Sequence, residues 1–239
     1  MRTAWKTDVG RLRTNNEDSI LVDEKLSIFL LADGLGGHNA GEVASSMAVN
    51  EAYSFLKERI DRVDDDGALF TLLTEALLAA HESVMKKAAT DPGLWGMGTT
   101  LVEMVVRRGK AFVCHAGDSR AYLFRDRLTL ITRDHTVGHY LLEQGELRER
   151  IHPRQYHILT QSVGAGERPA PDRNSLALEQ GDLLLLCSDG LTDMLNDADI
   201  EHILGRERRD PALLVDSLVK EANSRGGRDN ISVVLAEQA

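Results

Sequence analysis

The chain has 239 residues, 42% of them hydrophobic, and 38 acidic against 28 basic side chains give a formal net charge of -10. This length allows a sizeable core in one domain, and the negative charge opposes the attraction to phosphate backbones on which nucleic-acid binders depend. No run approaches the roughly 18 apolar residues of a membrane span, and the start MRTAWKTDVG lacks a signal peptide's apolar region. We therefore expect a cytoplasmic monomer that binds neither nucleic acid nor membranes.

The first part of the chain predicts a β-hairpin followed by two long helices. Residues 18–32 form two strand-like runs joined by the polar turn DEK, and the second run ends at Asp33-Gly34. After Gly41, apolar residues recur at helical spacing, and a second helix follows with Leu73, Leu77 and Val84 on one face. We expect the acidic stretch 61–67 between the helices to be a solvated loop and not a cation site.

From residue 99 onward the apolar pattern is that of strands. Residues 100–106 and 111–117 predict one hairpin, and residues 120–126 and 127–132 predict another. Residues 134–166 contain a short helix and otherwise look like a surface excursion of the kind that shapes access to a substrate.

The C-terminal part predicts a strand, two helices and a last strand. The strand covers 182–188, and the first helix runs from near Asn196 to Gly205. Asp210 is the expected N-cap of the second helix, and the last strand is 231–237. Antiparallel strands without strict βαβα alternation predict an α+β sandwich and not a doubly wound parallel sheet.

Nucleophile-based hydrolase chemistry finds no support in the sequence. A cysteine-dependent phosphatase needs an arginine six positions after its cysteine; Cys187 has Asp193 there, and Cys114, which has Arg120, lies within a strand. We interpret both cysteines as small buried hydrophobes. There is also no G-x-S-x-G elbow, no H-E-x-x-H, no P-loop and no paired phosphoaspartate motif. Attack by a metal-bound water remains.

Four aspartates stand at the ends of apolar runs that each have the length of one buried strand. Any one of them alone would suit a turn, because Asp-Gly and Asp-Asn are common turn dipeptides. Carboxylates brought together repel one another unless cations neutralise them, and hard oxygen ligands select Mg²⁺ or Mn²⁺ over Zn²⁺ or copper. We therefore predict a two-metal hydrolase site built from Asp33, Asp118, Asp189 and Asp229.

Six segments, in order and over essentially the whole chain, resemble those of the protein phosphatase 2C family, the metal-dependent serine/threonine phosphatases, in their compact bacterial form. They are RTNNEDS (13–19), ADGLGGHNAGEVAS (32–45), GMGTTL (96–101), HAGDSRAY (115–122), LCSDGLTDM (186–194) and GGRDNISVV (226–234). The resemblance implies one domain over 1–239, with a four-layer α-β-β-α sandwich of two antiparallel sheets flanked by helices. Residues 134–166 would be its flap.

The resemblance also implies the reaction. A hydroxide that bridges two Mn²⁺ or Mg²⁺ ions would attack the phosphorus of phosphoserine or phosphothreonine in a protein, without a covalent enzyme intermediate. A serine/threonine kinase acting on the same targets would be the counterpart.

Metal roles carry over by position. Asp33 would bridge both ions, the Gly34 carbonyl would complete one of them, and Asp189 and Asp229 would hold the other. The glycines after Asp33 and Asp189 suit a close approach of the backbone to a cation, because they lack a Cβ and allow unusual dihedrals.

Three further acidic residues concern weaker or indirect metal contacts. Glu17 and Asp18 match an acidic residue that touches the second ion directly or through water, and we favour Asp18. Asp118 matches the residue that binds a third, weaker ion in bacterial members. Its alternative role is to cap the backbone at Ser119 and Arg120.

Arg13 matches the family's phosphate-binding arginine, and its planar guanidinium suits bidentate capture of a phosphoryl group. His38 is a candidate proton donor to the leaving alkoxide, since histidine titrates near neutrality. It does not directly follow Asp33-Gly34, where Leu35 stands, so a structural role for His38 is equally open.

The chain departs from the common bacterial pattern at Gln161, where an arginine is frequent, and in the DHT of 134–136, where DHS is usual. Both positions lie by the expected flap, so they bear on substrate preference. Two rival classes are a pseudophosphatase, which the complete ligand set argues against, and a nucleotide phosphodiesterase. The latter usually adds histidine ligands and a basic groove.

Overall fold

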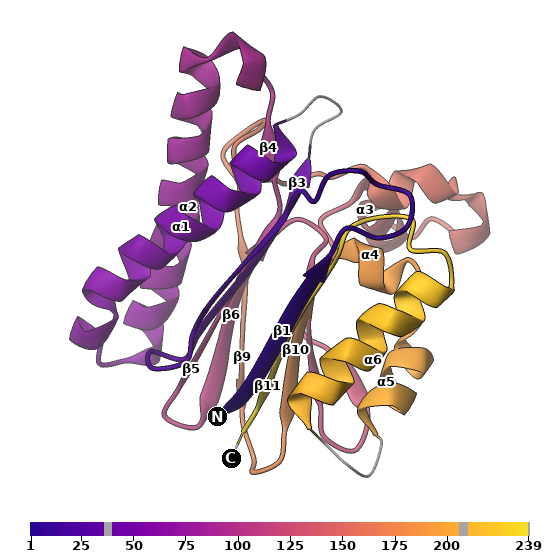
Figure 1. The fold of residues 1–239 in the computed structure, drawn as a ribbon. Coiled ribbons are helices and arrows are strands. Elements are labelled where there is room, and N and C mark those ends of the chain that lie inside the picture. The colour runs from indigo at the N-terminus through magenta and orange to yellow at the C-terminus, as the bar shows by residue number, and fades with distance from the viewer. Residues whose placement is uncertain (36–39, 206–209, 239) are drawn as a thin grey trace.

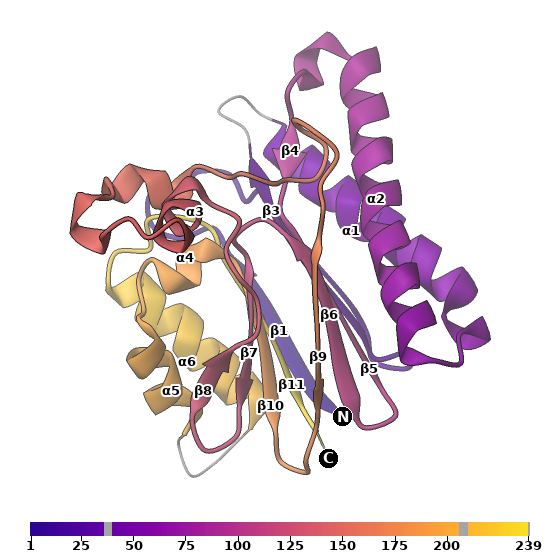
Figure 2. The same cartoon turned by 180° about the vertical axis from the view of Figure 1, so that it is seen from behind.

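Two antiparallel sheets lie face to face between helices in the computed structural model, as Figures 1 and 2 show. The structure describes residues 1–35, 40–205 and 210–238. One sheet has the strand order β1-β11-β10-β7-β8, and the other has the order β2-β3-β5-β6-β9, with β4 paired to β3. This is the predicted α-β-β-α sandwich.

The strands of the first sheet are β1 (Arg2–Asp8), β7 (Arg120–Phe124), β8 (Leu128–Leu130), β10 (Leu183–Cys187) and β11 (Ile231–Glu237). Those of the second are β2 (Asp18–Asp23), β3 (Ile28–Leu35), β4 (Gly98–Thr99), β5 (Leu101–Arg107), β6 (Lys110–Ala116) and β9 (Asp172–Ala177). The three predicted hairpins are present, because β2 pairs with β3, β5 with β6 and β7 with β8.

The α-helices are α1 (Gly41–Arg59), α2 (Asp66–Thr90), α3 (Val137–Glu143), α4 (Asp189–Thr192), α5 (Asp197–Leu204) and α6 (Pro211–Ser224). Asp210 caps α6 by accepting from the Ala212 N–H, as predicted, and Asn196, near which the preceding helix was expected to start, caps α5 by accepting from the Asp199 N–H. The acidic stretch between α1 and α2 holds a short 3₁₀ turn, Ile60–Arg62, and supplies the α2 N-cap, Asp65.

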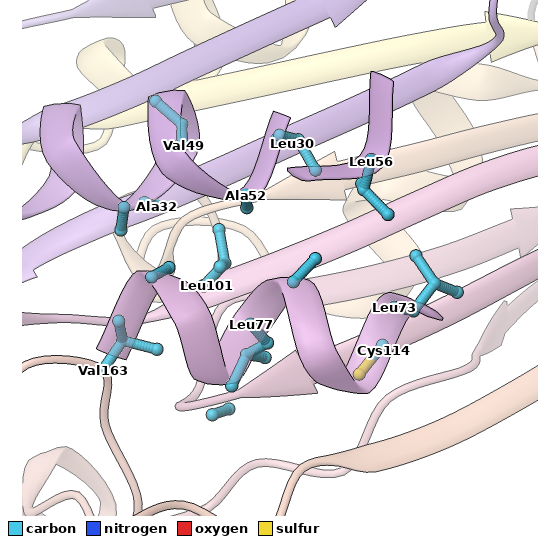
Figure 3. Close-up of a cluster of buried hydrophobic side chains, with 14 of the residues drawn as sticks. Leu30, Ala32, Val49, Ala52, Leu56, Leu73, Leu77, Leu101, Cys114 and Val163 are labelled. Carbon is cyan, nitrogen blue, oxygen red and sulfur yellow. The ribbon is translucent and has the colours of Figure 1, made fainter. Parts of the chain in front are cut away.

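Three clusters of buried apolar side chains separate the four layers. One lies between α1, α2 and the β2-β3-β5-β6-β9 sheet, and Figure 3 shows it with Cys114 among aliphatic side chains. The second lies between the other sheet and α5 and α6. The third lies between the sheets, where alternate residues such as Phe29 and Leu31 of β3 meet Leu184 and Leu186 of β10. Along central strands such as β3 and β10, alternate residues therefore belong to two different cores.

The helix α2 is long and apolar enough, by length and composition alone, to cross a membrane. Within the protein, 44% of its most apolar window is buried, and its inner face packs against α1 and the sheet. The sequence of this helix is interrupted by Glu75, Glu82 and Lys86, so it holds no uninterrupted apolar run of the length of a span, as expected. The core face of this helix accounts for the apolar content.

Candidate active site

A pocket of about 270 Å³ brings the four predicted aspartates together. It opens where β3 and β10 end and β11 begins, so strands of both sheets deliver side chains to it. Its wall also includes most of the other predicted site residues. The lining residues are Arg13, Glu17, Asp33, Gly34, Leu35, Asp118, His157, Leu159, Asp189, Asp229 and Asn230.

The backbone of Asp33 is held by hydrogen bonds with two adjacent threonines. Its N–H donates to the Thr100 hydroxyl at 2.9 Å, and its carbonyl accepts from the Thr99 hydroxyl and the Thr100 N–H, both at 2.8 Å. Asp33 and Gly34 are the sixth and seventh of the eight residues of β3, and Asp229 stands two residues before β11 begins. The expectation that these aspartates stand at strand ends is therefore confirmed to within two residues, and β3 extends one residue beyond the predicted end at Gly34.

Asp18 lies opposite Asp33 in the register of β2 and β3. It is only 8% exposed; one carboxylate oxygen accepts from the Ser188 hydroxyl at 2.8 Å, and the other is buried without a hydrogen-bond partner. Burial raises the Asp18 pKa to about 6. Glu17, by contrast, lines the pocket itself.

The glycines after Asp33 and Asp189 are required by close packing and not by dihedral angle, since neither Gly34 nor Gly190 has a positive φ. A Cβ on Gly34 would lie 2.4 Å from the Gly41 carbonyl, and one on Gly190 would lie 2.0 Å from the backbone carbonyl oxygen of Asn230. The dihedral part of the expectation is therefore wrong. The absence of a Cβ lets neighbouring backbones bring the aspartates together.

The carboxylates of the pocket repel one another. The pKa of Asp33 is raised well above its usual value by burial first, and then by the charges of Asp18, Asp189, Asp118 and Asp229. The pKa of Asp189 is raised in the same way, by burial first and then by the charge of Asp118, the largest of the charge effects. Such a group cannot be fully ionised without cations. All-oxygen donors with an unpartnered Asp18 oxygen fit hard divalent ions such as Mn²⁺ or Mg²⁺.

Arg13 reaches the same pocket from the loop between β1 and β2. Its Nη2 donates to the Asp229 carboxylate at 2.6 Å. The Asn230 side chain fixes this loop: its Oδ1 accepts from the Glu17 N–H, and its Nδ2 donates to the carbonyls of Val9 and Asn15. His38, the remaining predicted site residue, lies outside the described residues.

The family profile described as Protein phosphatase 2C matches residues 11–210. The chain belongs to the protein phosphatase 2C family. It is 37% identical to the serine/threonine phosphatase stp of Listeria innocua serovar 6a, over 100% of this chain and 96% of that one. It is 36% identical to the protein phosphatase PhpP of Streptococcus pneumoniae serotype 2, over 98% and 96% of the two chains.

Solved structures agree. The Mycobacterium tuberculosis serine/threonine phosphatase PstP matches with a TM-score of 0.86 and 34% identity, covering 99% of this chain and 98% of that one. A structure of the PstP catalytic domain in complex with two manganese ions matches with a TM-score of 0.84 and 35% identity, over 99% and 97% of the chains. The chain is therefore a metal-dependent protein serine/threonine phosphatase that uses Mn²⁺ or Mg²⁺.

Neither cysteine of this phosphatase is placed for nucleophilic chemistry. Cys114 and Cys187 are fully buried within β6 and β10. Burial raises the pKa of the Cys114 thiol well above its usual value and that of Cys187 to about 12. Both thiols stay protonated and inaccessible, as the sequence predicted.

Asp118 of the phosphatase lies in the turn between β6 and β7 and is 8% exposed. Burial, followed by the nearby Asp134 charge, raises its pKa to about 7. In the part of the chain that the structure describes, neither the Ser119 nor the Arg120 N–H donates to it. The capping alternative for Asp118 is therefore unsupported.

A second pocket of about 220 Å³ adjoins the first and shares three of its residues, Asp118, His157 and Asp189. Ligand atoms of His157, Asp189 and Asp193 lie within 4.8 Å of one another there. The sequence reading missed Asp193, Asn230 and Ser188 as site residues. All three stand inside family segments quoted above: Ser188 and Asn230 are adjacent to Asp189 and Asp229, and Asp193 is four positions after Asp189.

Proposed function

We propose that Asp33, the Gly34 carbonyl, Asp189 and Asp229 hold the two tightly bound ions of this phosphatase, with Asp33 between them. The observation that carries the assignment is the mutual repulsion at Asp33, whose pKa is raised by every other aspartate of the cluster. A buried group with that many like charges around it is the one that shared cations would stabilise most. Asp18 supports the site from its position opposite Asp33 in the register of β2 and β3, and Glu17 supports it from the pocket wall.

Arg13 binds the phosphoryl group of the substrate in this proposal. Its guanidinium already reaches a pocket carboxylate, so only a small reorientation brings it to an oxygen of a bound phosphate. The ions, when bound, lower the pKa of the attacking water and offset charge on the phosphoryl oxygens. The positively charged guanidinium of Arg13 stabilises negative charge on the same oxygens. His38 is the candidate proton donor to the leaving alkoxide.

We assign the third, weaker ion to the boundary of the two pockets, at Asp118. Asp193 adds a carboxylate there, and the His157 ring, whose Nδ1 is 3.8 Å from the Asp193 Oδ2, adds a nitrogen. This boundary lies against the excursion 134–166, which we propose acts as the flap over bound substrate. Residues 1–239 then work as a single catalytic domain.

The substrates are phosphoserine and phosphothreonine proteins, and a serine/threonine kinase acting on the same proteins is the partner that we expect. We propose a bacterial, cytoplasmic, signalling role for a monomer. The two tight ions are assigned to oxygen ligands alone, which supports protein monoester hydrolysis over nucleotide diester hydrolysis, and a phosphopeptide-versus-dinucleotide comparison of activity separates the two.

The metal assignment is tested with Asp189→Asn and Asp229→Asn. Each removes a charged ligand at nearly constant volume, so we expect a folded protein without turnover of a phosphothreonine peptide in Mn²⁺ and with weakened Mn²⁺ binding by calorimetry. Asp216→Asn is the matched control, because Asp216 is exposed, pairs with Lys6 and lines neither pocket. Wild-type activity of either site variant would refute the assignment.

A further inference from the structure

The first residues of the excursion are bonded to the turn that carries Asp118. The His135 N–H donates to the Gly117 carbonyl at 3.0 Å, and the Gly117 N–H donates to the His135 Nδ1 at 3.2 Å. The imidazole is 3% exposed. Gly117, the residue directly before Asp118, is therefore bonded to His135 through both its N–H and its carbonyl.

These bonds define the protonation of the ring. A backbone N–H can only donate, so Nδ1 of His135 carries the lone pair and the ring proton is on Nε2. That Nε2 faces the Asp172 carboxylate at 3.5 Å. Burial keeps the ring neutral by lowering the His135 pKa to about 4.

The same protonation argues against a metal site at this cluster, although His115, His135 and Asp172 bring potential ligand atoms within 4.8 Å of one another. Nε2 of His135 carries a proton and has no lone pair to offer. The rings of His115 and His135 are also stacked in parallel, 4.7 Å apart, so one ion cannot lie in both ring planes. The cluster fits a structural role better.

Gly117 has little freedom to change its conformation. Its φ is +113°, and a Cβ there would lie 2.6 Å from the Thr100 side chain. The Thr100 hydroxyl in turn bonds to the Asp33 N–H and lies 2.7 Å from the Ser119 hydroxyl. The direction in which the chain enters Asp118 is therefore defined by Thr100 on one side and by His135 on the other.

Asp134, the neighbour of His135, bonds to the other end of the same turn, after Asp118. Asp134 accepts two hydrogen bonds from the Arg120 guanidinium, at 2.9 and 2.7 Å, and is 7% exposed. Residues 134 and 135 thus bind on both sides of Asp118 at the point where the excursion begins.

We propose that His135 is a positioning residue: through its Nδ1 it orients the Gly117–Asp118 turn, and so links the base of the excursion to the Asp118 carboxylate. The proposal rests on the role assigned to Asp118 in the proposed function. It predicts that loss of the Nδ1 acceptor weakens the effect of the third ion and leaves the two tighter ions bound.

Two substitutions separate the Nδ1 acceptor from the rest of the ring. In His135→Asn the amide oxygen lies near the position of Nδ1, whereas in His135→Gln it lies near that of Nε2. We expect the Gln variant to speed hydrogen exchange at the Gly117 amide about tenfold, the loss of roughly one hydrogen bond. The Asn variant stays near wild type. Asp172→Asn, which changes the Nε2 side of the ring and the Asp172–Arg133 ion pair but leaves the Nδ1 acceptor in place, is the control.

Kinetics on a phosphothreonine peptide give the functional readout. We expect the Gln variant to need about tenfold more Mn²⁺ for half-maximal kcat, with KM nearly unchanged and two tight Mn²⁺ equivalents still seen by calorimetry; the Asn variant restores the wild-type requirement. Equal behaviour of the two variants overturns the proposal. If the Gln variant does not fold, fast Gly117 exchange in a folded Asn variant overturns it as well.

The same measurements distinguish failure of the inference from failure of the site assignment. If Asp118→Ala leaves the Mn²⁺ requirement unchanged while His135→Gln speeds Gly117 exchange, His135 orients the turn but Asp118 does not hold an ion. If Asp118→Ala impairs turnover and His135→Gln changes neither readout, Asp118 acts without help from His135, and the proposal is wrong.

Discussion

The Arg13 guanidinium and the Asp229 carboxylate form an ion pair at 2.6 Å, so the proposed phosphate ligand and a proposed metal ligand are partners in the same pocket. The side chains are 49% and 33% exposed, and a pair as exposed as this contributes no more than about 1 kcal/mol. Cations at Asp229 and a phosphoryl group at Arg13 can therefore each replace one partner at small cost. The pair holds both side chains at the pocket before substrate arrives.

Arg13→Ala tests the phosphate role. We expect kcat/KM on a phosphothreonine peptide to fall by about ten- to a hundredfold, the worth of a charge-assisted hydrogen bond, while Mn²⁺ affinity by calorimetry is unchanged or slightly improved. Arg11→Ala, on the same exposed loop, is the control. Unchanged KM and kcat would show that Arg13 is only a surface charge.

Asp118→Ala tests the third ion. We expect calorimetry to show that two tight metal equivalents remain, while the rate on phosphopeptides falls substantially. Tight metal binding would then be retained although turnover is impaired. If Asp118 served only the turn, the change would cost about 1 kcal/mol of stability and leave metal-saturated activity intact. Thermal unfolding and kinetics on the one variant decide between these outcomes.

Most of the fold follows from apolar periodicity, and the strands that sequence reading missed show where this signal ends. Strand β1 lies at a sheet edge with only Ala4 buried, and β9 lies at the edge of the other sheet with no fully buried residue. Edge strands face solvent with much of their surface, so they lack the apolar run by which a central strand such as β10 is recognised.

The charged residues of the site could be predicted from the sequence, whereas the contacts that position them could not. The aspartates stand out because carboxylates beside apolar runs are unusual, and the pocket brings all four together. Asn230 bonds to backbone groups more than 200 positions away along the chain. Nothing local in the sequence indicates such a contact. The close packing of Gly34 against Gly41 is likewise a property of the assembled fold.

Without metal, the acidic pocket should make stability depend on pH. The folded-state pKa values of Asp18 and Asp118, about 6 and about 7, lie above those of an unfolded chain near 4, so the folded protein binds more protons. Stability is therefore present at low pH and is lost as pH rises from about 4 through 7. Thermal unfolding with a chelator should give a higher Tm at pH 5.5 than at pH 8. Saturating Mn²⁺ should raise the Tm most at pH 8; equal metal effects at both pH values would contradict the carboxylate cluster.

A second buried acid tests the core apart from the site. Glu103 stands in the middle of β5, between Leu30 and Cys114 in the sheet register, fully buried with both carboxylate oxygens unpartnered. Burial raises its pKa well above the usual value, so the folded protein keeps it protonated, and stability falls as pH rises above the unfolded pKa. Glu103→Met replaces the acid with an unbranched apolar chain of similar size.

We expect Glu103→Met to stabilise the protein by about 1 to 3 kcal/mol at pH 7.5, because an unsatisfied buried polar group is removed. That corresponds to a rise of several degrees in Tm, with kcat and KM unchanged, because Glu103 does not line the pocket. Glu103→Gln, which cannot ionise but keeps an unpartnered polar group, should raise the Tm by less. The difference in Tm between wild type and each variant should widen toward pH 9. A Tm for Glu103→Met below that of wild type would mean that the carboxyl group contributes to the core, for example through a buried water that bonds to it.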